Sequence, residues 1–291
     1  MTRFIIPFLQ NFLWPILLGI SPAPARHWIQ QHVIGNRRYF QPEVQAMLAN
    51  LERFLPGVDL QRAAQQLRLS HLIDKSAPFH LPGFHTRILR EAAVHGGRPL
   101  PGQANLILGA HYGCAWWLLP WLKRQGMPVH FVTAPPIKPF HWHDWFIRPL
   151  SRWRWYCLAR AGGLPLISMR GASRTVSSAL AAGGCVNALI DIPPTLAKRC
   201  SAAPFLGRHA WMPMQLIRVA FEADIPVWFC CGYWDSEQDA AAMHFVRLHG
   251  SAEEVFEAYA SQLEQWLCNE PGRWHSWGHV DDFFKSPTSH A

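Results

Sequence analysis

The sequence predicts an α/β protein whose mainly parallel sheet is covered by helices. After residue 100, apolar runs of strand length alternate with helical stretches of ten or more residues, which is the pattern of strand–helix–strand units. The chain has 291 residues, of which 49% are hydrophobic and only 16% charged, so it is long and apolar enough to bury a substantial core. Neither an internal repeat nor a low-complexity segment is visible.

The first hundred residues are predicted to be mainly helical. Residues 42–55 place apolar side chains at helical spacing and are followed by Pro56 and Gly57, which end a helix. Residues 60–73 and 86–95 continue the helical pattern.

Five apolar runs in the rest of the chain have the length of buried strands: residues 105–110, 129–133, 185–191, 225–232 and 243–248. Helical stretches lie between or after these runs, at residues 113–125, 173–182, 213–223 and 252–268. The basic, Trp-rich residues 134–154 are predicted to be a connection.

The N-terminus predicts a membrane anchor in residues 1–25. Residues 4–20 carry no charge and are mostly apolar. The length of this run is near the lower limit for a helix that spans about 30 Å of hydrocarbon. Residues 23–25 resemble a signal-peptide cleavage site, but Pro7 and Pro15 interrupt the apolar run. We expect an uncleaved anchor that spans tightly or lies kinked in the interface.

The composition favours a protein that associates with a membrane surface on its cytosolic side. The formal net charge is +8, which suits anionic partners, and the 15 Trp are typical of a membrane interface. The seven Cys form an odd set without a CxxC pair, so they indicate reduced thiols rather than disulfides or a zinc ribbon.

His111 is the first candidate for chemistry because it follows the strand at residues 105–110 and precedes the next helix. Ligands of parallel α/β sheets bind beyond the carboxyl ends of the strands. An imidazole at that point can act as a general base on a hydroxyl or amine. The alternative is a histidine that only caps a strand end or helix start.

Several blocks together carry a resemblance to a known family. They are residues 108–113 (LGAHYG), 189–191 (LID), 203–208 (APFLGR), 270–279 (EPGRWHSWGH) and 284–285 (FK). The chain resembles the late, lauroyl/myristoyl-type acyltransferases of lipid A biosynthesis, within the lysophospholipid and glycerol-phosphate acyltransferase superfamily. The first block is similar to the strand, catalytic histidine and glycine of that family's HxxxxD/E motif. The likeness covers nearly the whole chain.

This resemblance implies a bacterial-type inner-membrane enzyme on the cytoplasmic face, with an acyltransferase-like domain at residues 26–285 and a C-terminal tail at residues 286–291. It would move a fatty acyl group from an acyl carrier protein or coenzyme A thioester to a lipid or lipid-like hydroxyl or amine. His111 would be the base, and no cofactor beyond the acyl donor would be needed. The implied partners are membrane lipids and the donor thioester.

The sequence departs from the family motif at its acidic position. The residue five after His111 is Trp116, and no Asp or Glu occurs between Glu91 and Asp144. Three explanations follow. Asp191 or Asp144 supplies the acid from elsewhere, the imidazole acts unassisted, or the protein is a catalytically degenerate homologue that binds lipid or acyl chains.

The connection before residue 160 supplies candidate cations. The resemblance implies an arginine here that holds a phosphate or the developing oxyanion, and spacing favours Arg154 ahead of Arg152. Alternatively, these arginines reach lipid headgroups while the tryptophans anchor in the acyl boundary. If this basic and aromatic segment bound single-stranded nucleic acid, RNP or OB-type sequence patterns would be expected. None is present, so we expect no nucleic-acid partner.

The remaining candidates concern the substrate and metals. Gly113, Phe205 and Gly207 are predicted to shape the substrate groove, where glycine permits close approach, although a simple turn is the alternative for the last two. His141, His143 and Asp144 lack a further ligand at convincing spacing, so we expect no metal site.

Overall fold

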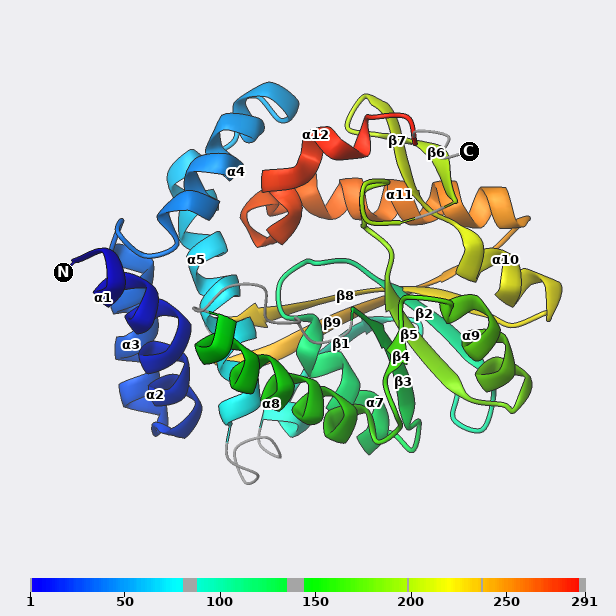
Figure 1. Ribbon diagram of the computed structural model, residues 1–291, viewed down its shortest axis with the longest axis horizontal. Helices are drawn as coiled ribbons and strands as arrows, with labels where there is room; N and C mark the ends of the chain where they lie inside the picture. The colour runs from blue at the N-terminus through cyan, green and yellow to red at the C-terminus, as the bar shows by residue number, and fades with distance from the viewer. Residues whose placement is uncertain (1, 81–87, 135–143, 198, 237, 288–291) are drawn as a thin grey trace.

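A computed structural model describes residues 2–80, 88–134, 144–197, 199–236 and 238–287. It confirms the α/β class: a seven-stranded sheet has helices on both faces (Figure 1). Its strand order is β1 (Ala93–Gly96), β9 (Ala240–Leu248), β8 (Val227–Asp235), β2 (Asn105–Gly109), β5 (Cys185–Leu189), β3 (Val129–Thr133) and β4 (Ile167–Ser168). Every neighbouring pair is parallel except β8 and β9, which are antiparallel.

The central strands are buried, as their continuous apolar sequences predicted. All five residues of β2 are buried, and β2 pairs with β5 in a register that sets Gly109 opposite Leu189. The carboxyl ends of these two strands therefore lie side by side, and so do the residues that follow them.

Helices cover both faces of this sheet. In Figure 1, α11 (Ala252–Asn269) lies on one face, and α7 (Leu118–Arg124) and α8 (Asp144–Gly162) lie on the other. Four other predicted helices are present as α4 (Gln41–Phe54), α5 (Leu60–Ser76), α9 (Ala172–Ala181) and α10 (Gln215–Glu222). Helix α8 corrects the sequence prediction, because residues 144–154 were expected to be an irregular connection.

Two further parts of the sheet structure differ from the prediction. Residues 93–96 form the edge strand β1 rather than the end of a helix, because they pair with β9. Residues 200–213, for which no strand was predicted, form an antiparallel hairpin of β6 (Cys200–Phe205) and β7 (Arg208–Pro213). Leu206 and Gly207 join its strands with φ angles of 50° and 71°, as a tight hairpin turn requires.

The N-terminal residues pack against the protein. They form α1 (Thr2–Phe8), one wide π-helical stretch (Leu9–Leu13), α2 (Trp14–Ile20) and α3 (Ala23–Gly35). Leu18 is fully buried, and the backbone N–H of Phe40 donates to Gln10 Oε1 at 2.8 Å. Within the described residues, no helix combines the length and apolar character that a membrane crossing needs, so the predicted spanning anchor is not supported.

Candidate active site

His111 and Asp191 meet where β2 and β5 end. Asp191 Oδ1 lies 2.8 Å from His111 Nδ1, and Asp191 Oδ2 accepts the backbone N–H of His111 at 2.8 Å. The side chain of Asp191 is fully buried, whereas that of His111 is 44% exposed. Of the two acids that the sequence offered as partners for His111, the structure brings Asp191 to it, at the carboxyl edge of the parallel sheet.

A segment near the C-terminus completes this pair. Trp274 is fully buried and its indole Nε1–H donates to Asp191 Oδ2 at 2.8 Å. On either side of Trp274, the N–H of Gly113 donates to the carbonyl of Arg273 at 2.7 Å, and the N–H of His275 donates to the carbonyl of His111 at 2.8 Å. Residues 273–275 therefore hold both the histidine turn and the carboxylate.

The environment of His111 suits a general base. Burial disfavours the imidazolium, but the charge of Asp191 and its hydrogen bond outweigh burial and raise the pKa of His111 above its ordinary value. A carboxylate at Nδ1 stabilises the tautomer with the proton on that nitrogen. Nε2 then remains the acceptor, in the arrangement that lets a histidine remove a proton from a nucleophile.

His111 lines a small cavity of about 160 Å³, together with Asp74, Trp116, Arg154 and His275. Trp116 also lines a second, mostly apolar groove of about 670 Å³ between the residues after α5 and helix α8. Trp116 thus lines both the His111 cavity and the apolar groove. Its Nε1–H is buried and has no hydrogen-bond partner among the described residues.

Arg154 does reach the cavity, but it is paired. Its guanidinium lies 2.7 Å from Asp74 Oδ2, on helix α5. Burial opposes ionisation of Asp74, but the charge and hydrogen bond of Arg154, together with the charges of His275 and His71, outweigh burial and lower the pKa of Asp74 to about 2. Sequence reasoning missed Asp74, because the helical pattern of residues 60–73 gives no sign of a partner 80 residues away.

The other predicted residues have different places. Gly113 lines the cavity with φ +61°, and a Cβ there would lie 2.3 Å from the carbonyl oxygen of Gly232. Arg152 is exposed on α8. Phe205 is buried, with its ring centroid 5.9 Å from that of Trp274, and Gly207 lies in the β6–β7 turn. The structure does not place Arg152, Phe205 or Gly207 in the lining of the His111 cavity.

His275 stacks on His71 beside the cavity, with ring centroids 4.4 Å apart. Burial is the main cause that lowers the pKa of His275 to about 4, with Asp74 opposing the shift and the charges of His111 and Arg154 adding to it. The ring is therefore neutral near pH 7. Among the described residues, its buried Nε2 has no hydrogen-bond partner.

This lowered pKa predicts acid destabilisation. Between pH 6.5 and 4 the unfolded chain protonates His275 and the folded protein does not, so the free energy of unfolding falls as the pH is lowered. The pKa near 4 implies a contribution on the order of 3 kcal/mol from this residue. Urea unfolding at pH 4, 5 and 6.5 should show that the free energy of unfolding falls less steeply in His275→Asn than in the wild type. The control His209→Asn, at an exposed position, should keep the wild-type dependence of the free energy of unfolding on pH. The same pH dependence in all three proteins would contradict the prediction.

Within the described part of the chain, no group of three or more His, Cys, Asp or Glu side chains is arranged to hold a metal ion. His141 and His143 lie outside the described residues, and Asp144 begins α8.

Comparisons with known proteins add nothing to this geometry: no protein-family model matches the chain, and a search of curated proteins found no match.

Proposed function

We propose that the protein transfers a fatty acyl group from a carrier or coenzyme A thioester to a lipid or lipid-like hydroxyl or amine. The observation that carries this proposal is the His111–Asp191 pair, whose histidine lies in a cavity that shares Trp116 with an apolar groove. A base next to an apolar channel suits a substrate whose reacting carbonyl is attached to a hydrocarbon chain.

In the proposed reaction, the acceptor oxygen or nitrogen attacks the thioester carbonyl while His111 Nε2 takes the acceptor's proton. Asp191 stabilises the imidazolium that forms. The tetrahedral intermediate then collapses, the carbon–sulfur bond breaks, and the imidazolium returns its proton to the leaving thiolate. Arg154, which lines the cavity, is the proposed donor for the developing oxyanion.

The apolar groove is proposed to hold the acyl chain. Ala77, Pro78 and Phe79 line it on one side, and Trp153 and Tyr156 line it from α8. Lys123 and Arg160 also contribute to the lining, so cations are present to meet the phosphate of a phosphopantetheine or coenzyme A carrier. The chain and the carrier would then bind to different parts of the same groove.

A second candidate function is lipid or acyl-chain binding without catalysis. The buried indole of Trp116 at the motif's acidic position favours it, because that position then contributes a wall of the groove instead of a charge. The two candidates share the groove and differ in whether His111 matters.

Product analysis separates them. Membranes or vesicles that hold the wild-type protein should form acylated product from acyl-carrier or acyl-CoA thioester and candidate lipid acceptors. His111→Gln should reduce the rate about 10²- to 10⁴-fold, the range typical of acid–base catalysis, with folding intact. His209→Gln, at an exposed position on β7, is the matched control and should keep the wild-type rate. If neither the wild type nor His111→Gln formed acylated product while both still bound acyl chains, only the binding function would remain.

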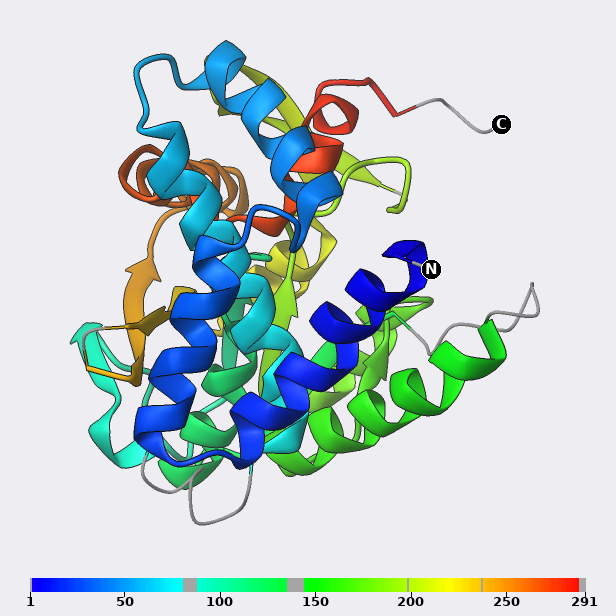
Figure 2. The ribbon, with the colours of Figure 1, turned by 90° about the vertical axis from the view of Figure 1, so that its left-hand side faces the viewer.

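Peripheral attachment to the inner membrane is part of the proposal. Large apolar side chains are exposed on α1–α3 and on α8: Ile5, Phe8, Ile20, Trp28, Trp153 and Tyr156. Figures 1 and 2 place α1, α2 and α8 next to one another. Such exposed aromatic and aliphatic groups, with a net charge of +8, suit the interface of an anionic bilayer.

This attachment predicts that Phe8→Asp weakens binding to vesicles that contain anionic lipid. A carboxylate at the interface removes apolar burial and adds repulsion, so we expect at least a tenfold loss in a flotation or sedimentation assay. Phe221→Asp is a matched control, because Phe221 is 54% exposed on α10 against 55% for Phe8, at the opposite end of the molecule (Figure 1). Failure of the wild type to bind at low salt, or equal losses in both variants, would refute the attachment.

A further inference from the structure

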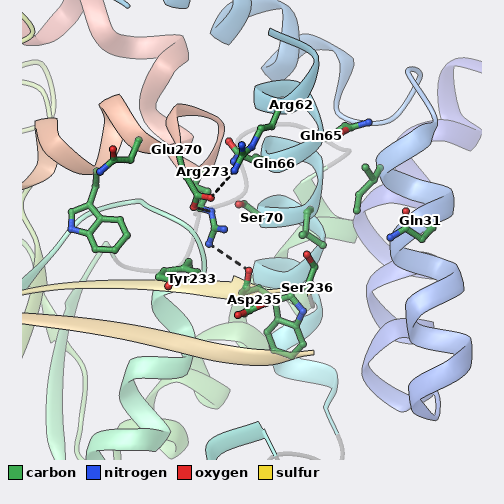
Figure 3. A pocket seen from close by; sticks show the side chains of 15 residues that line it. Gln31, Arg62, Gln65, Gln66, Ser70, Tyr233, Asp235, Ser236, Glu270 and Arg273 are labelled. Carbon is green, nitrogen blue, oxygen red and sulfur yellow. Dashed lines mark hydrogen bonds and ion pairs between the residues drawn. The ribbon is translucent and has the colours of Figure 1, made fainter. Parts of the chain in front are cut away.

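A second large pocket lies away from the His111 cavity. It has a volume of about 690 Å³ and is formed by α3, α5, the end of β8 and the end of α11 (Figure 3). Glu270 and Arg273, from the block at residues 270–279, line it, but none of the residues that line the His111 cavity does. Its size is that of a small-molecule site, and nothing in the proposed reaction uses it.

The charges of this pocket are balanced internally. Glu270 Oε2 lies 2.5 Å from Arg273 Nε, and Glu270 Oε1 lies 3.5 Å from Arg62. Arg273 also lies over the ring of Tyr233, 4.2 Å from its centroid. Asp235, at the end of β8, adds a second negative charge, so two carboxylates face two guanidinium groups. With equal numbers of positive and negative side chains, the lining favours neither an anion nor a cation by its net charge.

Neutral polar groups make up the rest of the wall. Figure 3 shows Gln66 on α5 beside Glu270 and Arg273, Gln65 and Ser70 on the same helix, and Gln31 on α3. Gln66 Oε1 is buried and has no hydrogen-bond partner among the described residues, and Ser70 is only 6% exposed. A buried acceptor without a donor costs free energy, which a ligand hydroxyl would recover.

Aromatic faces complete the pocket. Tyr233 and Trp266 both line it, with ring centroids 5.8 Å apart, and Trp234 is a third aromatic lining residue. Amides and hydroxyls both donate and accept, which matches groups that do the same, while aromatic rings pack against C–H surfaces. Sugars offer both features in one molecule and carry no charge.

We propose that this pocket binds a neutral sugar, free or as the headgroup of a glycolipid. The sugar hydroxyls would bond to the glutamine amides, Ser70 and the Glu270–Arg273 pair, and a ring face would pack on Trp266. This binding is independent of acyl transfer, so it stands or fails without reference to the function of His111.

Titration calorimetry with the full-length protein tests the pocket. The probes are maltose, lactose and N,N′-diacetylchitobiose, vesicles that carry glucosyl-diacylglycerol, and inorganic phosphate as the anion. We expect saturable binding of at least one neutral sugar, weakened at least tenfold by Gln66→Leu and by Gln31→Ala. Gln61→Leu is the matched control, since Gln61 is exposed on the same helix and lies outside the pocket lining. Circular dichroism of each variant separates lost binding from lost folding.

The outcomes are distinct. Binding of the free disaccharides identifies the sugar itself as sufficient. Binding of the glycolipid vesicles that exceeds binding of the same vesicles without the glycolipid, and that Gln66→Leu weakens, identifies a headgroup, and both results support the proposal. Binding of phosphate in place of any sugar would overturn it in favour of an anion site. Sugar binding that survives both Gln66→Leu and Gln31→Ala would place the ligand elsewhere, and no binding of any sugar probe would refute the proposal.

Discussion

Asp191→Asn should reduce acyl transfer about 10²- to 10⁴-fold while His111 is still present. The amide cannot stabilise an imidazolium as a carboxylate does, and it favours the wrong tautomer of the ring at the 2.8 Å contact with Nδ1. The pH profile gives a second readout. Because Asp191 raises the pKa of His111, the rate of the wild type should rise with pH through a value above 6.5. In Asp191→Asn this rise should move to lower pH.

Asp224→Asn is the matched control for that variant, since Asp224 is exposed and its backbone φ of 52° suits asparagine equally well. Asp224→Asn should keep both the wild-type rate and the pH at which the rate rises. If Asp191→Asn had the wild-type rate and its rate rose with pH at the same pH as in the wild type, the His111–Asp191 pair would be structural only. The kinetic comparison needs only relative rates, so any donor that the wild type accepts is sufficient.

Trp116→Glu should destabilise the protein by an amount on the order of 3 kcal/mol, because Trp116 is 4% exposed and the carboxylate would replace a large apolar group. It should also lower activity, since Asp191 already occupies the Nδ1 side of His111 and a second acid adds nothing there. Urea unfolding and the transfer assay measure the two effects separately.

Trp116→Phe provides the comparison. It keeps an aromatic ring in the wall but removes the Nε1–H together with part of the buried indole, so a loss of stability on the order of 1–3 kcal/mol is expected. A drop in the rate of a variant that is fully folded under assay conditions would assign a role in the reaction to the indole. If Trp116→Glu instead gained activity over the wild type, the site would be a degraded copy of the family motif that an acid restores.

Much of the fold could be predicted from local pattern. The strands β2, β3, β5, β8 and β9 were predicted because buried parallel strands are continuous apolar runs. The edge strand β1 was missed because its four residues are defined by pairing with β9 rather than by their own sequence. The β6–β7 hairpin was missed for a similar reason, since a Leu-Gly turn gives a weaker hairpin signal than Asn-Gly.

The candidate site could be predicted only in part. His111 and Asp191 each follow a central strand, and the parallel register of β2 and β5 brings such residues together. The partners Asp74 and Trp274 come from outside the sheet and reach the site through helix packing and a C-terminal turn. No periodicity within the chain encodes a contact of that kind, so those partners needed the three-dimensional structure.

The hydrogen bonds between residues 111–113 and 273–275 have a consequence for biosynthesis. The histidine turn leaves the ribosome long before the segment that fixes it. Until Trp274 arrives, Asp191 Oδ2 lacks its indole donor, and the turn at residues 111–113 lacks its backbone bonds to Arg273 and His275. A nascent chain therefore carries an incomplete site, and the surroundings of the His111–Asp191 pair are completed only after residues 273–275 have been made.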